Sequence, residues 1–186
     1  FGGGLPYDPT SPTTTDNALV LKFTPAGEFL LQIGDFGRGT EGSSSTEFLG
    51  QPTDIFVDSG ADEVYITDGY TNRRVIVFDA TSGDYKRMWG AFGNTPRDLD
   101  RCPPPALSSV PSGPGPDQFS IVHAIRVSND GLVYVADREN RRVQVFTVAG
   151  SFVKQLVRRE APFARNLALS SDSEQQFLYV GGGDDI

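Results

Sequence analysis

The chain has 186 residues, 38% hydrophobic and 22% charged, with a formal net charge of −8, which excludes an extensively disordered protein. The negative charge argues against nucleic acid as a partner, because phosphates would be repelled without a strong basic patch. No run approaches the ~18 apolar residues of a membrane span, so none is predicted.

The first segment, residues 1–15, holds three prolines and little periodicity, which predicts an irregular N-terminal arm. It starts Phe1-Gly-Gly-Gly, with no initiator Met and no signal-peptide pattern. This start indicates either that a leader was removed or that the sequence is an internal piece of something longer. The next segment predicts two strands, Ala18–Phe23 and Glu28–Ile33, joined by a turn.

A longer pattern then occurs twice. Asp68-Gly-Tyr-Thr-Asn-Arg-Arg-Val-Ile-Val-Phe78 and Asp137-Arg-Glu-Asn-Arg-Arg-Val-Gln-Val-Phe146 each follow a short alternating strand and precede a Gly-bearing turn and a further strand. Phe23 aligns with Phe78 and Phe146, so the first two strands correspond to the last two of each later unit. Repetition of this kind has to be recognised before any fold is assigned.

A 25-residue segment with seven prolines, residues 94–118, separates the two copies and predicts a long surface loop. Cys102 lies in it and is the only cysteine, so no internal disulfide can form. Asp68 and Asp137 are 69 positions apart, which becomes 44 without this insertion, and Tyr134 and Tyr179 are 45 apart. A four-stranded propeller blade takes about 40–45 residues, and no helix-period segment competes for the chain.

These spacings predict an all-β propeller of about three blades. In chain order the expected parts are a half-blade at 16–37, a blade at 48–93, the insertion at 94–118, a blade at 119–157 and a half-blade at 165–186. An open arc of blades leaves unpaired sheet edges exposed to other chains, so we expect the blades to close into a ring. Either the chain is part of a larger six-bladed protein, or two chains close a six-bladed ring by exchanging half-blades.

The motif Asp-x-x-Asn-x-Arg-[Val/Ile]-x-Val-Phe, placed after Val-Tyr-[Ile/Val]-x, resembles the signature of NHL-repeat β-propellers. The resemblance covers the chain outside residues 1–15 and the insertion. It implies that the Asp and Asn side chains cap a tight turn through backbone amides, and that the following Arg bridges groups within the blade. The aliphatic residues would pack blade against blade.

Four segments look most similar to one enzyme group among these propellers, the peptidyl-α-hydroxyglycine α-amidating lyases. The segments are Gln51-Pro-Thr-Asp-Ile, Asp68-Gly-Tyr-Thr-Asn, Gln118-Phe-Ser-Ile-Val-His123 and Ala136-Asp-Arg-Glu-Asn140. The first motif copy also carries one extra residue, in the turn with Tyr70. Cysteines of the lyases are replaced by Thr71 and Val133, so their disulfides are absent.

This resemblance implies a zinc ion held by three histidines, with His123 at one ligand position, Tyr70 at the catalytic tyrosine and Arg138 at a cavity arginine. Such a zinc has an open position for a substrate oxygen. The arginine fork suits a carboxylate. Calcium is also implied by the family. His123 is the only histidine, so the other zinc ligands would have to come from outside this chain.

The residues taken alone leave plainer alternatives open. An isolated histidine is usually a packed or solvated residue, and Tyr70 and Arg138 can be exposed turn residues, with Glu139 as a local ion-pair partner. The chain is then either part of a lyase that cleaves a C–N bond, or a non-catalytic propeller that binds a protein, a peptide or copies of itself. An extracellular or periplasmic location is expected for either.

Overall fold

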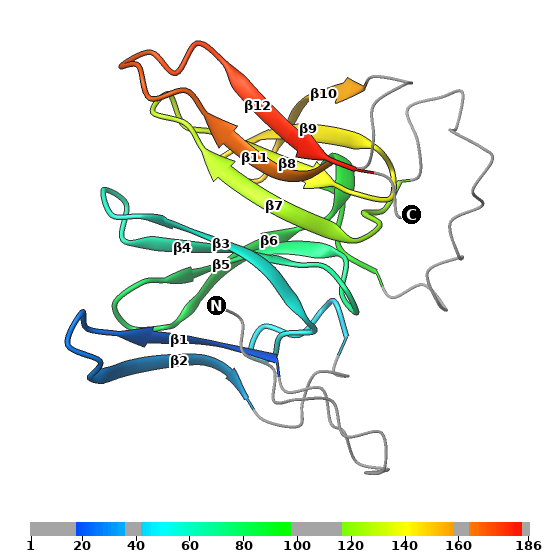
Figure 1. The fold of residues 1–186 in the computed structure, drawn as a ribbon. Helices are drawn as coiled ribbons and strands as arrows, with labels where there is room; N and C mark the ends of the chain where they lie inside the picture. Colours follow the sequence, from blue (N-terminus) through cyan, green and yellow to red (C-terminus); the bar gives the residue numbers. More distant parts are fainter. Residues whose placement is uncertain (1–17, 36–41, 98–116, 158–163, 184–186) are drawn as a thin grey trace.

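The computed structural model describes residues 18–35, 42–97, 117–157 and 164–183, which form antiparallel sheets only (Figure 1). Two sheets have four strands and two have two strands. The strands are β1 (Ala18–Phe23), β2 (Phe29–Asp35), β3 (Pro52–Asp58), β4 (Glu63–Asp68), β5 (Arg74–Asp79), β6 (Tyr85–Trp89), β7 (Val122–Val127), β8 (Leu132–Asp137), β9 (Arg142–Thr147), β10 (Phe152–Val157), β11 (Ala164–Leu169) and β12 (Leu178–Gly182).

Each four-stranded sheet is one propeller blade, with its strands paired in chain order from β3 to β6 and from β7 to β10. Short turns join consecutive strands, which is why neighbours in the sequence are neighbours in the sheet. The sheets β1–β2 and β11–β12 are half-blades, and they lie at opposite ends of the stack (Figure 1). The predicted all-β propeller fold is confirmed.

Irregularities in the strand pairing identify which half of a blade each two-stranded sheet represents. Phe23 pairs with Phe29 beside a register shift, as Phe78 pairs with Tyr85 and Phe146 with Phe152. Sheet β1–β2 therefore corresponds to the third and fourth strands of a blade. Sheet β11–β12 has its register shift between Ala164 and Asn166, at the place where the first two strands of both full blades shift. It corresponds to the first and second strands.

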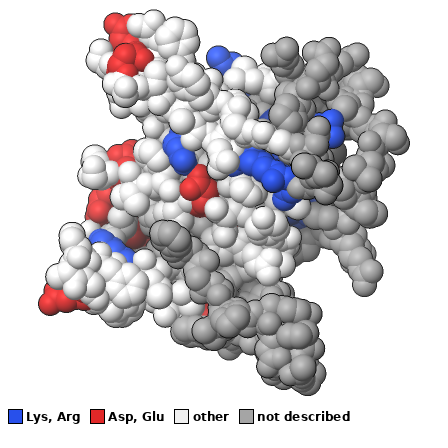
Figure 2. Space-filling model, in the orientation of Figure 1, with Lys and Arg blue, Asp and Glu red and all other residues white. Residues whose placement is uncertain are grey.

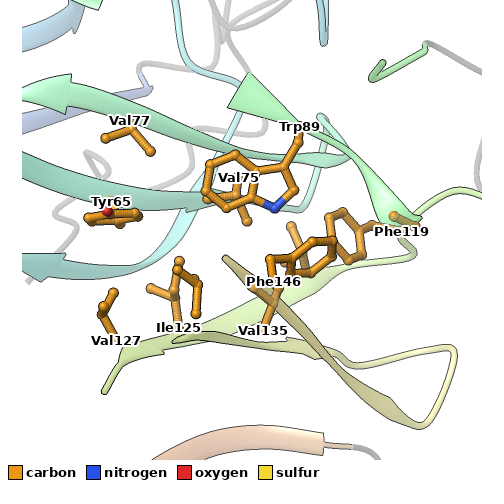
Figure 3. Close-up of a cluster of buried hydrophobic side chains, with 12 residues drawn as sticks. Tyr65, Val75, Val77, Trp89, Phe119, Ile125, Val127, Val135 and Phe146 are labelled. Atoms are coloured by element: carbon orange, nitrogen blue, oxygen red, sulfur yellow. The ribbon is translucent and has the colours of Figure 1, made fainter. Parts of the chain in front are cut away.

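The main core lies between the two full blades (Figure 3). Tyr65, Val75 and Val77 project from one blade toward Ile125 and Phe146 of the other, and all are at most 2% exposed. Alternation along each strand sends every second side chain to this interface and the others to the opposite neighbour. At about 25 cal/mol per Å² of apolar surface, each fully buried Val or Ile contributes roughly 1.5–3 kcal/mol, so blade packing is the main source of stability.

A buried ion pair closes the turn between the second and third strands of each full blade. Asp68 bonds Arg74 at 3.0 Å and Asp137 bonds Arg142 at 2.7 Å, with all four side chains at most 1% exposed. The motif asparagines, Asn72 and Asn140, donate to the same carboxylates at 2.8 Å. The predicted role of the arginines is confirmed.

The predicted role of the aspartates is only partly right. They accept backbone amides, but from the segment before the blade rather than from their own turn: Gly50 N bonds Asp68 and Ser120 N bonds Asp137, both at 2.8 Å. Each aspartate therefore fixes the start of its blade to the end of the second strand.

The strand predicted at Glu28–Ile33 runs instead from Phe29 to Asp35. Strand β12 extends to Gly182, because Gly181 and Gly182 pair with Asn166 and Ala164 in the ladder. The only helical element among the described residues is a short 3₁₀ turn, η1 (Ala91–Gly93). Residues 1–15, Cys102 and most of the insertion at 94–118 lie outside the described residues.

Candidate functional site

Three consecutive inner strands each carry one residue at the same register shift. These residues are Thr53 in β3, His123 in β7 and Arg165 in β11, each skipped in the pairing with the neighbouring strand. A β-bulge leaves its extra residue unpaired and re-aims its side chain, which is why bulges are common beside active sites. The three residues therefore occupy equivalent positions at the same end of the inner strands, although their side chains differ.

His123 bonds through its Nδ1 to the backbone oxygen of Arg165 in the next inner strand, at 2.7 Å. A carbonyl oxygen can only accept, so Nδ1 carries the hydrogen, and the tautomer with this hydrogen has its lone pair on Nε2. Histidines that bind metal ions hold their rings in this manner, with the second nitrogen donating to a carbonyl or carboxylate. The half-buried imidazole is therefore oriented with Nε2 available for a ligand.

Tyr70 lies against His123, with the two rings edge to face and their centroids 6.2 Å apart. The amides of Gly69 and Tyr70 both donate to the oxygen of Gln51, at 3.2 and 3.4 Å, which accommodates the extra residue of this turn. Tyr70 is 47% exposed, so its ring contacts the imidazole on one side and solvent on the other. The structure thus brings together two of the three side chains selected from the sequence.

Arg138 follows β8 directly, and its amide donates to the oxygen of Ile121 at 3.2 Å, two residues before His123. It therefore lies at the same end of the blades as His123. Its Nε is 3.2 Å from Oε1 of Glu139, with the two side chains only 12% and 10% exposed. The predicted local ion pair with Glu139 is confirmed, but it is largely buried rather than exposed.

The two ends of the blades differ in charge, as Figure 2 shows by its red atoms mostly at the left and its largest blue group in the right half. Acidic side chains occupy the turns that follow the first and third strands, among them Asp58, Asp62, Asp84, Asp130 and Asp172. Arginines occupy the opposite end: Arg73, Arg138, Arg141 and Arg165. The end that holds Tyr70 and His123 is therefore the end that favours an anion.

Thr53 is a residue of this region that sequence reasoning missed. Its Oγ1 lies 2.7 Å from the oxygen of Val122 and 2.8 Å from Thr67 Oγ1, so it links the first full blade to the second. The sequence feature that could have identified Thr53 is its alignment with His123 in the repeat. A threonine in a strand carries no chemical signature by itself, so only the shared bulge position identifies it.

Within the described residues there is no group of three His, Cys, Asp or Glu side chains that could hold a metal ion. His123 supplies one suitable ligand atom. No helix of the described segments is long and apolar enough to cross a membrane.

Comparison with known proteins finds an NHL repeat at residues 119–146. The chain is 32% identical over 171 residues to peptidyl-glycine alpha-amidating monooxygenase B of Xenopus laevis, covering 91% of this chain and 17% of that protein. It is 27% identical over 160 residues to a probable peptidyl-alpha-hydroxyglycine alpha-amidating lyase of Caenorhabditis elegans, covering 79% of this chain and 39% of that protein.

Among solved structures, the WD40 repeats of RRP9 match 81% of this chain and 36% of their own, with 14% identity and a TM-score of 0.49. The chain thus spans well under half the length of the curated relatives given above. The resemblance to NHL-repeat propellers and to the amidating-lyase group is confirmed.

Proposed function

From its NHL repeat and its similarity to amidating lyases, we propose that this chain forms part of a propeller that cleaves peptidyl-α-hydroxyglycine. The reaction breaks the C–N bond between the amide nitrogen and the hydroxyl-bearing carbon. The hydroxyl proton is removed, its oxygen becomes a carbonyl, and the amide nitrogen takes a proton. The products are a peptide amide and glyoxylate, without net oxidation.

The single observation that carries the proposal is the contact between Tyr70 and His123 at the arginine-rich end of the blades. Tyr70 would take the hydroxyl proton of the substrate. Phenols ionise near pH ~10 in water, and a neighbouring cation lowers that value. A general base must lie within hydrogen-bond reach of the proton it removes, and the solvent-facing side of Tyr70 leaves room for a substrate there.

The carboxylate of the hydroxyglycine would be bound by Arg138, whose planar fork can donate two parallel hydrogen bonds. Glu139 forms an ion pair with this guanidinium, with its Oε1 3.2 Å from Nε. This pair fixes the orientation of Arg138 before a substrate arrives, which lowers the entropic cost of binding. The surrounding arginines add a field that attracts the same anion.

His123 fits the role of one zinc ligand, since Nδ1 is occupied by the Arg165 carbonyl and Nε2 is left for coordination. The remaining ligands would come from outside the described residues. Zinc bound there would supply Lewis-acid polarisation of a substrate oxygen. An extracellular or periplasmic location and a structural calcium ion are further parts of this proposal, carried over from the lyase resemblance.

The test is to incubate the purified protein with an α-hydroxyglycine-extended peptide and to follow peptide amide and glyoxylate by mass spectrometry. Tyr70→Phe should lower kcat about 10²- to 10⁴-fold, the usual size of general-base catalysis. Tyr85→Phe is the matched control, because Tyr85 lies on β6 and contacts Phe78 instead. Equal activity of wild type and Tyr70→Phe would contradict the assignment.

Two substitutions of His123 separate its two nitrogens. His123→Asn keeps an N–H near the position of Nδ1 and so preserves the bond to Arg165 O, but it has no counterpart of Nε2. The proposal expects this variant to keep its unfolding midpoint and to lose zinc, measured by elemental analysis, together with turnover. A variant that keeps both metal and activity would instead make His123 a blade-linking residue.

The second candidate is a non-catalytic propeller that binds a protein or peptide. The observation in its favour is the number of large apolar side chains that stay exposed on the half-blades. A protein without turnover on any α-hydroxyglycine peptide, but with saturable binding of a partner, would favour this function.

A further inference from the structure

His123 lies at a point where its own sheet holds it weakly. The pairing of β7 with β8 passes directly from Val122 to Ala124, so His123 is skipped in the ladder. β7 is also the last strand of its four-stranded sheet, so no other strand of that sheet pairs with its second side. A residue outside the ladder keeps more freedom in its two backbone dihedrals. Other contacts must therefore fix the backbone around His123.

The inner strand of the preceding blade, β3, supplies contacts on both sides of His123. Thr53 Oγ1 donates to Val122 O at 2.7 Å, one residue before the histidine. Asp54 Oδ2 accepts a hydrogen bond from Ile125 N at 3.0 Å, two residues after it. The Val122 oxygen belongs to the same planar peptide group as the amide nitrogen of His123. Thr53 and Asp54 therefore hold β7 at two points that enclose the histidine.

The Asp54 carboxylate is itself held by groups of both strands. Its Oδ2 also accepts from Arg126 Nη1 of β7 at 2.6 Å, and its Oδ1 accepts from Ile55 N of its own strand at 2.9 Å. Hydrogen bonds between ionised groups are shorter and stronger than those between neutral groups. The Asp54 and Arg126 side chains are 26% and 33% exposed, so solvent screens part of their attraction. We therefore expect Asp54 to fix the position of β7 more than to stabilise the fold.

The turn that carries Tyr70 rests on the same carbonyl group that Thr53 binds. A Cβ at Gly69 would lie 1.9 Å from Val122 O, so the Gly69 backbone packs directly against this oxygen. Tyr70 follows Gly69 and His123 follows Val122, and the two rings meet edge to face with their centroids 6.2 Å apart. A shift of Val122 would therefore move His123 relative to Tyr70.

The carboxylate contact is specific to the junction between the two complete blades. In the strand register, Asp54 corresponds to Ala124 in β7 and to Asn166 in β11. Ala124 has no polar side chain, so β7 cannot bind the backbone of β11 in the same way. Among the inner strands that the structure describes, a carboxylate therefore holds the next inner strand only beside His123.

We infer that Thr53 and Asp54 are positioning residues for His123, which hold its imidazole in place against Tyr70. Both act through the backbone of β7 rather than on the substrate. Their effect on the reaction rests on the proposed lyase function, in which His123 Nε2 and the Tyr70 hydroxyl have to face one substrate. A displacement of about 1 Å in a catalytic group can cost roughly 10²-fold in rate.

The first experiment uses the imidazole as its own reporter, because His123 is the only histidine in the chain. The full chain is prepared with isotope-labelled histidine, and NMR records the ring signals and their Overhauser contacts to Tyr70. The wild type should show one set of ring signals with contacts to the Tyr70 ring. Thr53→Val and Asp54→Ala should each shift these signals and weaken the contacts, because each removes one of the two points that hold β7.

The matched controls are Asp58→Ala and Thr147→Val, at the opposite end of the blades. Asp58 lies on the same strand, β3, and accepts two amides of the turn that follows it. Thr147 accepts an amide in the turn after β9. Both controls remove comparable hydrogen bonds without touching β7, so the His123 signals should stay at their wild-type positions. Signals that move equally in the controls, or that stay unmoved in Thr53→Val and Asp54→Ala, would overturn the inference.

The second experiment measures turnover of the α-hydroxyglycine-extended peptide by the same variants. Loss of positioning should lower kcat about 10- to 100-fold, the usual effect of changing a group that orients a metal ligand. KM should stay unchanged, because Arg138 still binds the substrate carboxylate. Thr53→Ser keeps the hydroxyl and should restore most of the rate, whereas a wild-type kcat in Thr53→Val would contradict the inference.

The two experiments separate the positioning role from the reaction itself. The His123 signals report on the position of the imidazole whether or not the chain converts the peptide. A wild type without turnover but with His123 signals that move only in Thr53→Val and Asp54→Ala would contradict the lyase function and support the positioning role. Turnover by the wild type with unmoved signals in both variants would do the reverse.

Discussion

The two complete blades share one buried framework and differ in the residue at the inner-strand bulge. In both, an aspartate binds an arginine, an asparagine and an amide from the preceding segment, at 2.7–3.0 Å. At the bulge, one blade has Thr53 and the other has His123, and each bonds a backbone oxygen of the next inner strand at 2.7 Å. Both bulge residues therefore link blades, while only the histidine retains a second polar atom for chemistry.

The largest effect is expected from breaking the shared framework. Arg142→Met and Arg74→Met each leave a buried aspartate without its counterion, which typically costs 3–5 kcal/mol of unfolding free energy. Urea denaturation should show a loss of this size in both variants. Arg97→Met, which removes an ion pair with both side chains more than half exposed, should cost less than about 1 kcal/mol. A loss in either buried variant no larger than that of Arg97→Met would contradict the stabilising role of the buried pair.

Much of this framework could be predicted from the sequence. The repeated motif predicted an arginine that bridges groups within each blade, and the alignment of Phe23 with Phe78 and Phe146 identified β1–β2 as the outer half of a blade. Local patterns of this kind depend on residues close together in the chain. The bonds from Asp68 to Gly50 and from Asp137 to Ser120 could not be predicted, because they join residues 18 and 17 positions apart across a blade.

The site was less predictable than the fold. Tyr70, His123 and Arg138 were chosen through a family resemblance, which does not specify the edge-to-face contact between the Tyr70 and His123 rings. The bulge that aims His123 is a property of strand pairing and depends on β8 as much as on β7. Glycines weaken strands, yet Gly181 and Gly182 remain paired with β11.

A second prediction concerns a steric difference between the turns that follow β4 and β8. Gly69 and Arg138 occupy equivalent positions, but a Cβ at Gly69 would lie 1.9 Å from the oxygen of Val122. Gly69→Ala must therefore move backbone and should cost about 1–3 kcal/mol, as overpacking usually does. Gly60→Ala, whose Cβ would meet only the Asp58 carboxylate at 3.3 Å, is the matched control. Thermal unfolding checks both, and equal midpoints would refute the steric argument.

A third effect concerns an ion-pair network that only the first full blade has. Bonds from Arg87 hold the pKa of the Glu63 carboxyl at about 2, against an ordinary value of 4.5. In the second blade Leu132 replaces Glu63 in the register. Because the folded pKa is the lower one, this stabilisation is complete above about pH 4.5 and disappears as pH falls toward 2.

Glu63→Gln should accordingly be less stable than the wild type by about 1–2 kcal/mol at neutral pH, since Arg87 is partly exposed and solvent screens the pair. Urea titrations at successive pH values should show the gap closing below pH 4.5 and vanishing near 2. In an Arg87→Met background the gap should be small at every pH. If the stability difference between the wild type and Glu63→Gln grew as the pH falls, the network would not stabilise the protein through an ionised Glu63.

The smallest effect tests the linking role of the bulge residue itself. Thr53→Val keeps the shape of the side chain but removes the hydroxyl that bonds the Val122 carbonyl, so it should cost about 1 kcal/mol, the net value of one hydrogen bond. Thr53→Ser keeps the hydroxyl and should recover most of that loss. If Val and Ser variants unfold at the same urea concentration, Thr53 does not join the blades through its hydroxyl. The parallel bond from His123 to Arg165 would then be better explained as orienting the imidazole than as holding two blades together.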